Sequence, residues 1–285
     1  MKKKVLIPLI CLVLLLGGAV GYTVSRGITP EEAEAISDSK AAENRPQASV
    51  ISEEEAGKAN ASITLSQNSS ESDSSKVRID NSTNIITISY PGTYRLSGTL
   101  EEGQIKINTS SKEAVILVLD GVSVTNSQEA ALLVENSHDL TLYLQAGTEN
   151  VFTSGQETEI TLAASDDAAT GGAITLKDDA TICGSGSLTV KGYVNNGIHC
   201  SNNLFIESGT LSVTAVNNGI KGKDSLTIDG GDITILSGND GLKSDDTTGE
   251  GCGVVTLNDG TLNIESFQDA VQTETILTVN GGTLT

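Results

Sequence analysis

Residues 187–237 of the chain read SLTVKGYVNNGIHCSNNLFIESGTLSVTAVNNGIKGKDSLTIDGGDITILS, and this stretch repeats one pattern. Similar triplets begin at Leu188, Leu211 and Ile233, and further copies begin at Leu262 and Leu284. Their steps are 23, 22, 29 and 22 residues. A period of this length is typical of repeat proteins in which each repeat forms one coil of a solenoid.

Two more series repeat with the same period. Each triplet carries apolar residues at i and i+2 around a polar one, which predicts a strand with alternate side chains inside. Glycines stand between the strands, where the chain must turn, and no 3.6-residue period supports an α-solenoid. Three strands for every 22 residues or so predict an all-β, right-handed, single-stranded parallel β-helix. The triplets of the second series begin at Leu204, Leu226, Val255 and Leu277. In the third series a small residue precedes an apolar one, at residues 197, 219, 241 and 270. The insertion TTGEGCG accounts for the 29-residue step.

The composition supports a thin, aliphatic core. The chain has 30 glycines, 4 prolines, no tryptophan and 3% aromatic residues, so its interior must be filled by stacked aliphatic side chains. Its net charge of −20 argues against nucleic acid or an anionic lipid surface as a direct partner and makes cations plausible ones. Cys183, Cys200 and Cys252 are an odd set, and we expect each to be a small apolar residue of the core.

The N-terminus is typical of an exported protein. Three lysines at positions 2–4 precede a stretch of about 20 apolar residues, so we assign residues 1–26 to a signal peptide or an N-terminal membrane anchor. Residues 27–76 are predicted to be an acidic, flexible linker, and residues 77–285 the parallel β-helix domain. The last coil is incomplete, so we expect a continuation or a cap. The protein is therefore expected outside the cell or at the cell surface.

Polar pairs precede each strand of the Gly–Ile series, and further acids follow the same strands. Stacked coils would bring these side chains to one edge, where carboxylate and amide oxygens are the ligands that Ca²⁺ prefers. An asparagine ladder that binds turn amides is the alternative and needs no metal. We favour this ladder for the rungs of Asn195 and Asn217, and calcium for the stretch from Asp240 to Asp269. The candidate metal ligands are Asn218, Asp224, Asp240, Asp245, Asp246 and Asp269.

Two lysines occupy equivalent places one coil apart, Lys221 and Lys243. Such a stripe could bind the carboxylates of an acidic polysaccharide, or one lysine beside calcium could act as the base of an elimination reaction. Charge balance against the neighbouring acids is the simplest interpretation. The sequence contains no nucleophile elbow, phosphate loop or zinc-site spacing.

The chain resembles a family of bacterial β-helix carbohydrate-binding proteins known from clostridial cellulose degraders. The stretches that carry the resemblance are ISYPGTYRLSGTLEEGQIKI, ILVLDGVSVTNS, ITLKDDATICGSGSLTVKGYVNNGI, AVNNGIKGKDSLTIDGGDITI and NDGLKSDD. The resemblance implies a pectate-lyase-like fold with bound calcium and binding of cellulose-like or acidic plant polysaccharides. It favours Asp240, Asp245, Asp246 and Asp269 as ligands, whereas Asn196 and Asn218 depart from the acids of the family.

We therefore predict a noncatalytic, calcium-associated, monomeric module that binds polysaccharide, and that touches a membrane only if the N-terminal segment is retained. The first alternative is a calcium-dependent, pectate-type lyase with Lys221 or Lys243 as its base. The second alternative is a structural surface adhesin that binds a protein partner.

Overall fold

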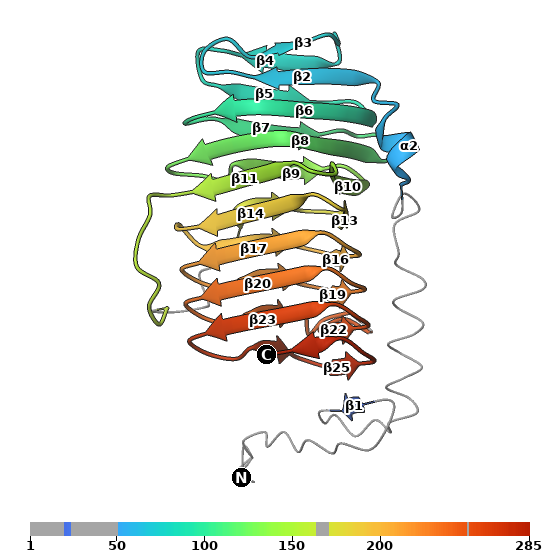
Figure 1. Ribbon diagram of the computed structural model, residues 1–285, viewed down its shortest axis with the longest axis vertical. Helices are drawn as coiled ribbons and strands as arrows, with labels where there is room; N and C mark the ends of the chain where they lie inside the picture. Colours follow the sequence, from blue (N-terminus) through green and yellow to red (C-terminus); the bar gives the residue numbers. More distant parts are fainter. Residues whose placement is uncertain (1–19, 24–50, 164–170, 250) are drawn as a thin grey trace, which may run out of the picture.

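The computed structural model describes residues 20–23, 51–163, 171–249 and 251–285 of the chain. Within them the chain winds into a solenoid of parallel strands stacked along the long axis of the molecule (Figure 1). The predicted all-β, parallel architecture is confirmed. None of the helices in these ranges has both the length and the apolar character required to cross a membrane.

The strands form three faces, which we call the first, second and third face in the order in which each coil visits them. The first face is a nine-stranded sheet, and the other two faces form one 17-stranded sheet because β6 (Gly92–Leu100) and β8 (Val115–Asn126) run along both. The first face contains β4 (Val77–Asp80), β5 (Ile85–Ile88), β7 (Gln104–Asn108), β9 (Leu132–Asn136), β12 (Gly172–Leu176), β15 (Asn196–Cys200), β18 (Ile220–Gly222), β21 (Leu242–Ser244) and β24 (Val271–Thr273).

The remaining strands follow the same order from coil to coil. The second face contains β10 (Asp139–Leu144), β13 (Asp179–Gly184), β16 (Asn203–Ile206), β19 (Ser225–Ile228), β22 (Val254–Leu257) and β25 (Ile276–Val279). The third face contains β11 (Glu149–Ser154), β14 (Ser187–Gly192), β17 (Thr210–Ala215), β20 (Asp232–Ser237), β23 (Thr261–Ser266) and β26 (Thr283–Leu284). β2 (Ala61–Leu65) lies on the second face, because it pairs with the first half of β6.

The register of the strands confirms the repeat. Leu188 pairs with Leu211, and Leu211 pairs with Ile233, as the first triplet series requires. Ile198 pairs with Ile220 in the same way on the first face. Equivalent residues of successive coils therefore lie one strand spacing apart, about 4.8 Å.

The core is a continuous stack of aliphatic side chains between the three faces. Leu188, Leu211 and Ile233 are at most 1% exposed and represent one column of it. Burial of each such side chain stabilises the fold by about 1.5–3 kcal/mol relative to exposure. Cys183, Cys200 and Cys252 are free and buried, as predicted.

The predicted linker ends earlier than residue 76, and this is a correction. Ser52 caps the short helix α2 (Glu53–Ala56), and β2 pairs in parallel with β6. Ala61, Ile63 and Leu65 of β2 are buried, because their period of two residues places all three on the core side. The β-solenoid therefore begins at β2, ahead of the boundary at residue 77, and β3 (Glu71–Ser72) pairs back onto β2.

Most of the predicted N-terminal signal or anchor segment lies outside the described residues. Its last part forms β1 (Val20–Thr23), which pairs antiparallel with β25 at the lower end of the solenoid (Figure 1). Residues 27–50 of the predicted linker also lie outside the described residues.

The glycines of the Gly–Ile series are required by the close approach of successive coils. A Cβ on Gly219 would lie 2.4 Å from Cγ2 of Ile235 and 2.7 Å from the carbonyl oxygen of Gly241. We expect Gly219→Ala to lower the free energy of unfolding by about 1–3 kcal/mol, because a well-packed core must shift to admit the methyl group. Urea denaturation measures this loss. Ala270→Gly, at the equivalent place in the exposed last coil, is the control and should change stability by less than about 1 kcal/mol; equal effects would contradict the packing explanation.

Candidate functional site

The outward side chains of the first face form a column that crosses the coils. Thr175 of β12, His199 of β15 and Lys221 of β18 pair in register, and Lys243 of β21 follows. Their neighbours Ile174, Ile198, Ile220 and Leu242 point into the core. Alternation along each strand therefore places this polar column on the outer side of the face, where its members are 6–8% exposed.

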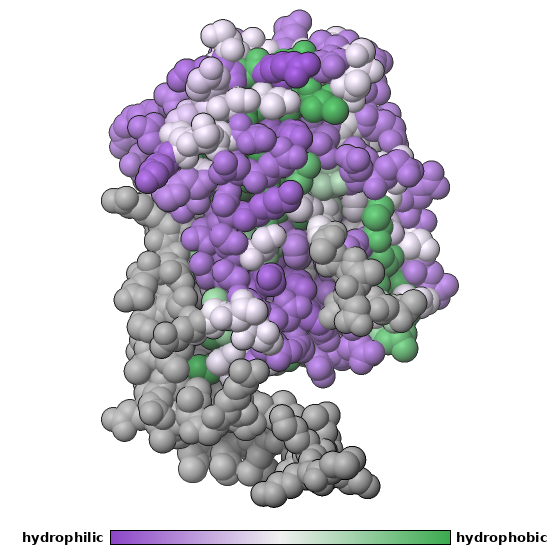
Figure 2. All heavy atoms as spheres, turned by 180° about the vertical axis from the view of Figure 1, so that it is seen from behind, coloured by the Kyte–Doolittle hydropathy of each residue, from purple (hydrophilic) through white to green (hydrophobic). Residues whose placement is uncertain are grey.

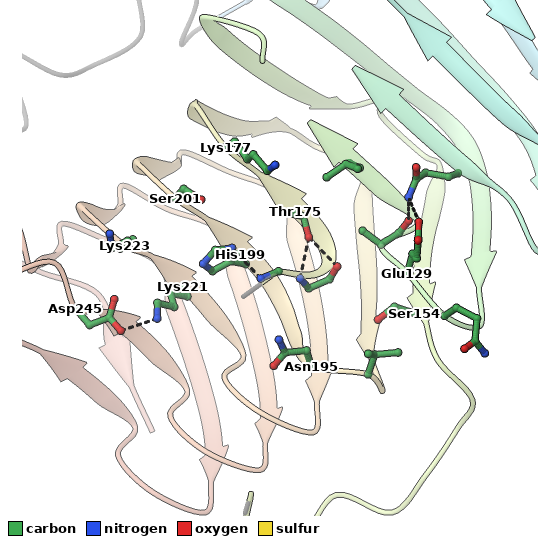
Figure 3. Close-up of a pocket in the computed structure, with 17 residues that line it drawn as sticks. Glu129, Ser154, Thr175, Lys177, Asn195, His199, Ser201, Lys221, Lys223 and Asp245 are labelled. Carbon is green, nitrogen blue, oxygen red and sulfur yellow. Dashed lines mark hydrogen bonds and ion pairs between the residues drawn. The ribbon is translucent and has the colours of Figure 1, made fainter. Parts of the chain in front are cut away.

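A second column lies two residues further along each strand. It consists of Lys177, Ser201, Lys223 and Asp245, each just after the corresponding strand. The amide of Ser201 donates to the carbonyl of Leu176, and successive coils continue this pattern. Figure 3 shows Lys177, Ser201 and Lys223 following one another beside the column of Thr175, His199 and Lys221.

A groove of about 930 Å³ follows these columns, and we call it the first-face groove. It extends from Gln104 on β7 to Asp245 after β21, so it crosses six coils and runs along the solenoid axis. At about 4.8 Å per coil its length is about 24 Å. The side of the molecule opposite to the view of Figure 1 is mostly hydrophilic, with few apolar side chains (Figure 2). The groove is thus long enough for several units of a polymer.

The two lysines singled out from the sequence occupy different environments. The Nζ atom of Lys221 lies 2.5 Å from Oδ2 of Asp245, and both residues line the groove (Figure 3). The Nζ atom of Lys243 lies 2.8 Å from Oδ2 of Asp240, and both side chains are buried. Lys221 is only 8% exposed but lines the groove together with its partner, whereas Lys243 and Asp240 form an ion pair outside the lining.

His199 lies in the middle of the groove and was not a candidate from the sequence. It is 7% exposed, and its Nδ1 accepts a hydrogen bond of 3.3 Å from the amide of Gly171. Burial, together with the positive charge of Lys221, lowers the pKa of His199 to about 4. At neutral pH the ring is uncharged and carries its proton on Nε2.

The predicted polar rungs form a hydrogen-bonded ladder. Oδ1 of Asn196 accepts from the amide of Asn218, Oδ1 of Asn218 accepts from the amide of Asp240, and Oδ1 of Asp240 accepts from the amide of Asp269, at 3.1–3.2 Å. Asn217 donates to Asn195 in a parallel ladder at 3.0 Å. The metal-free alternative is therefore present at the asparagine rungs, and both oxygens of Asp240 are occupied by protein donors.

Two of the six predicted metal ligands are brought together at another corner. Asp224, Asp246 and Cys252 each place one donor atom within 4.8 Å of the other two. Burial raises the pKa of Asp224, and the nearby carboxylate of Asp246 raises it further. Hydrogen bonds from the amide and hydroxyl of Thr248 lower the pKa of Asp246. The structure thus divides the predicted ligand set into a ladder, two lysine pairs and this corner cluster.

Sequence reasoning missed Lys177 and gave Lys223 no role of its own. Both lie in the groove, two residues after the outward positions of β12 and β18. The sequence signal that could have identified both lysines is their shared position, three residues after the apolar residue of the Gly–Ile series. It was weak because the step from Ile174 to Ile198 is 24 residues, so Lys177 fell outside the regular 22-residue spacing.

Comparison with known proteins agrees with this architecture. The family model of carbohydrate-binding domain-containing proteins matches residues 82–285. The chain belongs to this family. A carbohydrate-binding domain-containing protein of Acetivibrio thermocellus is 36% identical over 149 residues, which are 50% of this chain and 51% of that protein. The chain thus matches about half the length of this relative.

A solved structure is also similar to this carbohydrate-binding domain. It is described as the polysaccharide lyase-like protein from C. thermocellum, in a gadolinium derivative. The TM-score is 0.69 at 31% identity, and the match covers 79% of this chain and 100% of that one. The resemblance noted from the sequence, to a bacterial carbohydrate-binding family with a lyase-like fold, is confirmed.

The depressed pKa of His199 predicts that acid destabilises the carbohydrate-binding domain. Between about pH 6.5 and pH 4 the imidazole of His199 is protonated in the unfolded state but neutral in the native state. The free energy of unfolding therefore falls as the pH falls. The full contribution is about 3 kcal/mol. Denaturation of the wild type and of His199→Gln at pH 7 and pH 4.5 measures it, and the variant should lose less stability between the two values. Equal losses would mean that the imidazole is not responsible.

Proposed function

We propose that the first-face groove binds a polysaccharide that carries carboxylates, and that the domain does so without catalysing a reaction. The observation that carries this proposal is the gathering of Lys177, Lys221 and Lys223 in one groove of a chain with a net charge of −20. The three lysines outnumber the two acids of the lining, Glu129 and Asp245, and an excess of positive charge in one cleft of an acidic protein is matched to an anionic ligand. Membership of the carbohydrate-binding family supports a glycan as that ligand.

The other lining groups suit the hydroxyls of a sugar. Ser201 carries a hydroxyl group and Asn195 offers an amide at the two ends of β15, whereas the hydroxyl of Thr175 is engaged by the backbone of Gly172. Such groups can donate to and accept from a glycan, including a neutral, cellulose-like one. The exposed aromatic residues Tyr90 and Phe267 lie outside this lining, and its large exposed apolar residue is the aliphatic Val194, so stacking on an aromatic platform is not the mode of binding that we propose.

The contacts within the groove favour binding over elimination. A base must reach the proton that it removes, with a free electron pair. The ammonium of Lys221 is held by Asp245, and Nδ1 of His199 already accepts a backbone hydrogen bond. A pectate-type lyase is the second candidate because the similar solved structure is described as polysaccharide lyase-like.

We place the domain outside the cell as a single-chain module. The basic and apolar N-terminal segment of the sequence supports export. The excess of acidic residues supports solubility there and leaves the lysines of the groove as a local feature.

We expect Lys177→Gln and Lys223→Gln each to weaken binding of polygalacturonate up to about fivefold, because each removes one exposed charge contact. Calorimetric titration of the full chain at low salt measures the affinity. Lys191→Gln on β14 of the third face makes the same charge change away from the groove and should have no effect. Unchanged binding by the double variant would place the site elsewhere, and absorbance from an unsaturated product would establish the lyase.

We also propose that calcium stiffens the corner formed by Asp224 and Asp246. The two carboxylates supply hard oxygen ligands, and their close approach without an intervening cation leaves like charges in contact, which supports a bound divalent cation. The sulfur of Cys252 is a poor ligand for calcium, so only the two acids fit this ion. Asp240 and Asp245 are engaged by lysines and are not included in this set.

Calcium at ten times its dissociation constant should raise the free energy of unfolding by about 1.4 kcal/mol. For an extracellular module this requires millimolar calcium. Asp224→Asn should remove the calcium effect while leaving the calcium-free protein at least as stable, because it relieves the contact between like charges. Thermal denaturation with calcium and with a chelator tests this. Asp232→Asn, at the exposed start of β20, is the matched control, and an undiminished calcium effect in Asp224→Asn would refute the assignment.

A further inference from the structure

The second column of the groove presents its charges in a fixed order along the axis. Lys177, Ser201 and Lys223 stand on consecutive coils, so the two ammonium groups are separated by two coils, or about 10 Å. Glu135 occupies the equivalent position on the coil before Lys177, and Asp245 occupies it on the coil after Lys223. Read along the axis, the column is negative, positive, neutral, positive and negative.

The two lysines are free to meet a ligand. Lys177 and Lys223 are exposed, and neither Nζ lies within 4 Å of a carboxylate of the described residues. The acids at the two ends are each paired with a lysine of the protein. Glu135 is paired with Lys106 at 2.8 Å, and Asp245 is paired with Lys221. A ligand thus finds two positive charges, two coils apart, neither held in a salt bridge by a carboxylate of the described residues. Lys177 acts on Glu135, and Lys223 acts on Asp224 and Asp246, only at longer range.

The coil between the two lysines adds no charge. It contributes Ser201, whose hydroxyl donates and accepts, and His199, whose burial keeps it neutral at neutral pH. An extended glycan advances by a distance comparable to one strand spacing for each sugar, so a chain along this groove would place about one sugar on each coil. Every second sugar would then face a lysine.

We propose that the first-face groove is matched to an acidic polysaccharide whose carboxylates stand on alternate sugars, with a neutral sugar between them. This rests on the proposed function of the groove as a glycan site. A polymer with a carboxylate on every sugar, all on the same side of its chain, would place its additional charges opposite Ser201, which cannot neutralise them, and opposite Glu135 and Asp245, which repel them. Like charges placed together are a recognised means of rejecting a wrong ligand.

Three hexasaccharides on one α-1,4-glucan backbone test this proposal, because successive sugars of that chain turn their C6 groups to the same side, whereas those of a β-1,4-glucan alternate between the two sides. The first is neutral, the second is oxidised to glucuronate at every second sugar, and the third is oxidised at every sugar. Calorimetric titration of the full chain at low salt should rank the alternating oligosaccharide as the tightest ligand. Its advantage over the fully oxidised one should be about tenfold, the effect expected of two unfavourable charge contacts.

A charge added between the two lysines should reverse this preference. Ser201→Lys makes the column continuous over three coils, so the fully oxidised hexasaccharide should gain affinity relative to the alternating one. Ser212→Lys on β17 of the third face adds the same charge away from the groove and should leave the ranking unchanged.

The outcomes separate the two proposals. If the fully oxidised hexasaccharide binds the wild type as tightly as the alternating one, and Lys177→Gln and Lys223→Gln still weaken it, the groove binds glycans but the alternating pattern is wrong. If neither acidic hexasaccharide binds, the proposed function of the groove is itself overturned.

Discussion

The parallel hydrogen bonding between successive coils is the constraint on which this molecule depends. Each coil satisfies its backbone through the coils before and after it, and this fixes equivalent residues about 4.8 Å apart. Any residue type that suits one coil must therefore suit its stacked neighbours. Leucine and isoleucine fill the core columns, and small residues recur where two coils approach most closely, as at Gly197, Gly219 and Gly241.

The same constraint governs the polar columns, where stacking would otherwise bring like groups into conflict. Asn196 and Asn218 avoid this because an amide can accept from one neighbour and donate to the other. When the column turns acidic at Asp240, the carboxylate needs a cation, and the buried ammonium of Lys243 supplies it. The ladder and its ion pair therefore fix the edge of the first face, and this edge positions the groove.

The sequence predicts the parts of the fold that recur and misses those that do not. All three series of apolar residues were identified with the correct register, because the core imposes them on every coil. The start at β2 was missed because its alternation, ASITL, occurs once within an acidic stretch. For the site, Asp245 and Asp246 were grouped as ligands because they are neighbours in the sequence. In the structure Asp245 points to Lys221 in the groove, whereas Asp246 points to Asp224 at the corner. Spacing alone does not give the direction of a side chain at a strand end.

The charge of the whole chain and the charge of the groove act over different distances. With a net charge of −20 the protein repels an anionic polymer at long range, which slows the encounter at low ionic strength. At physiological ionic strength the Debye length is about 8 Å, close to the separation of Lys177 and Lys223 along the axis. A glycan then interacts with the two lysines only once it lies in the groove, and it interacts with them as two separate charges. Selection therefore depends on the match between the spacing of its carboxylates and the spacing of the coils.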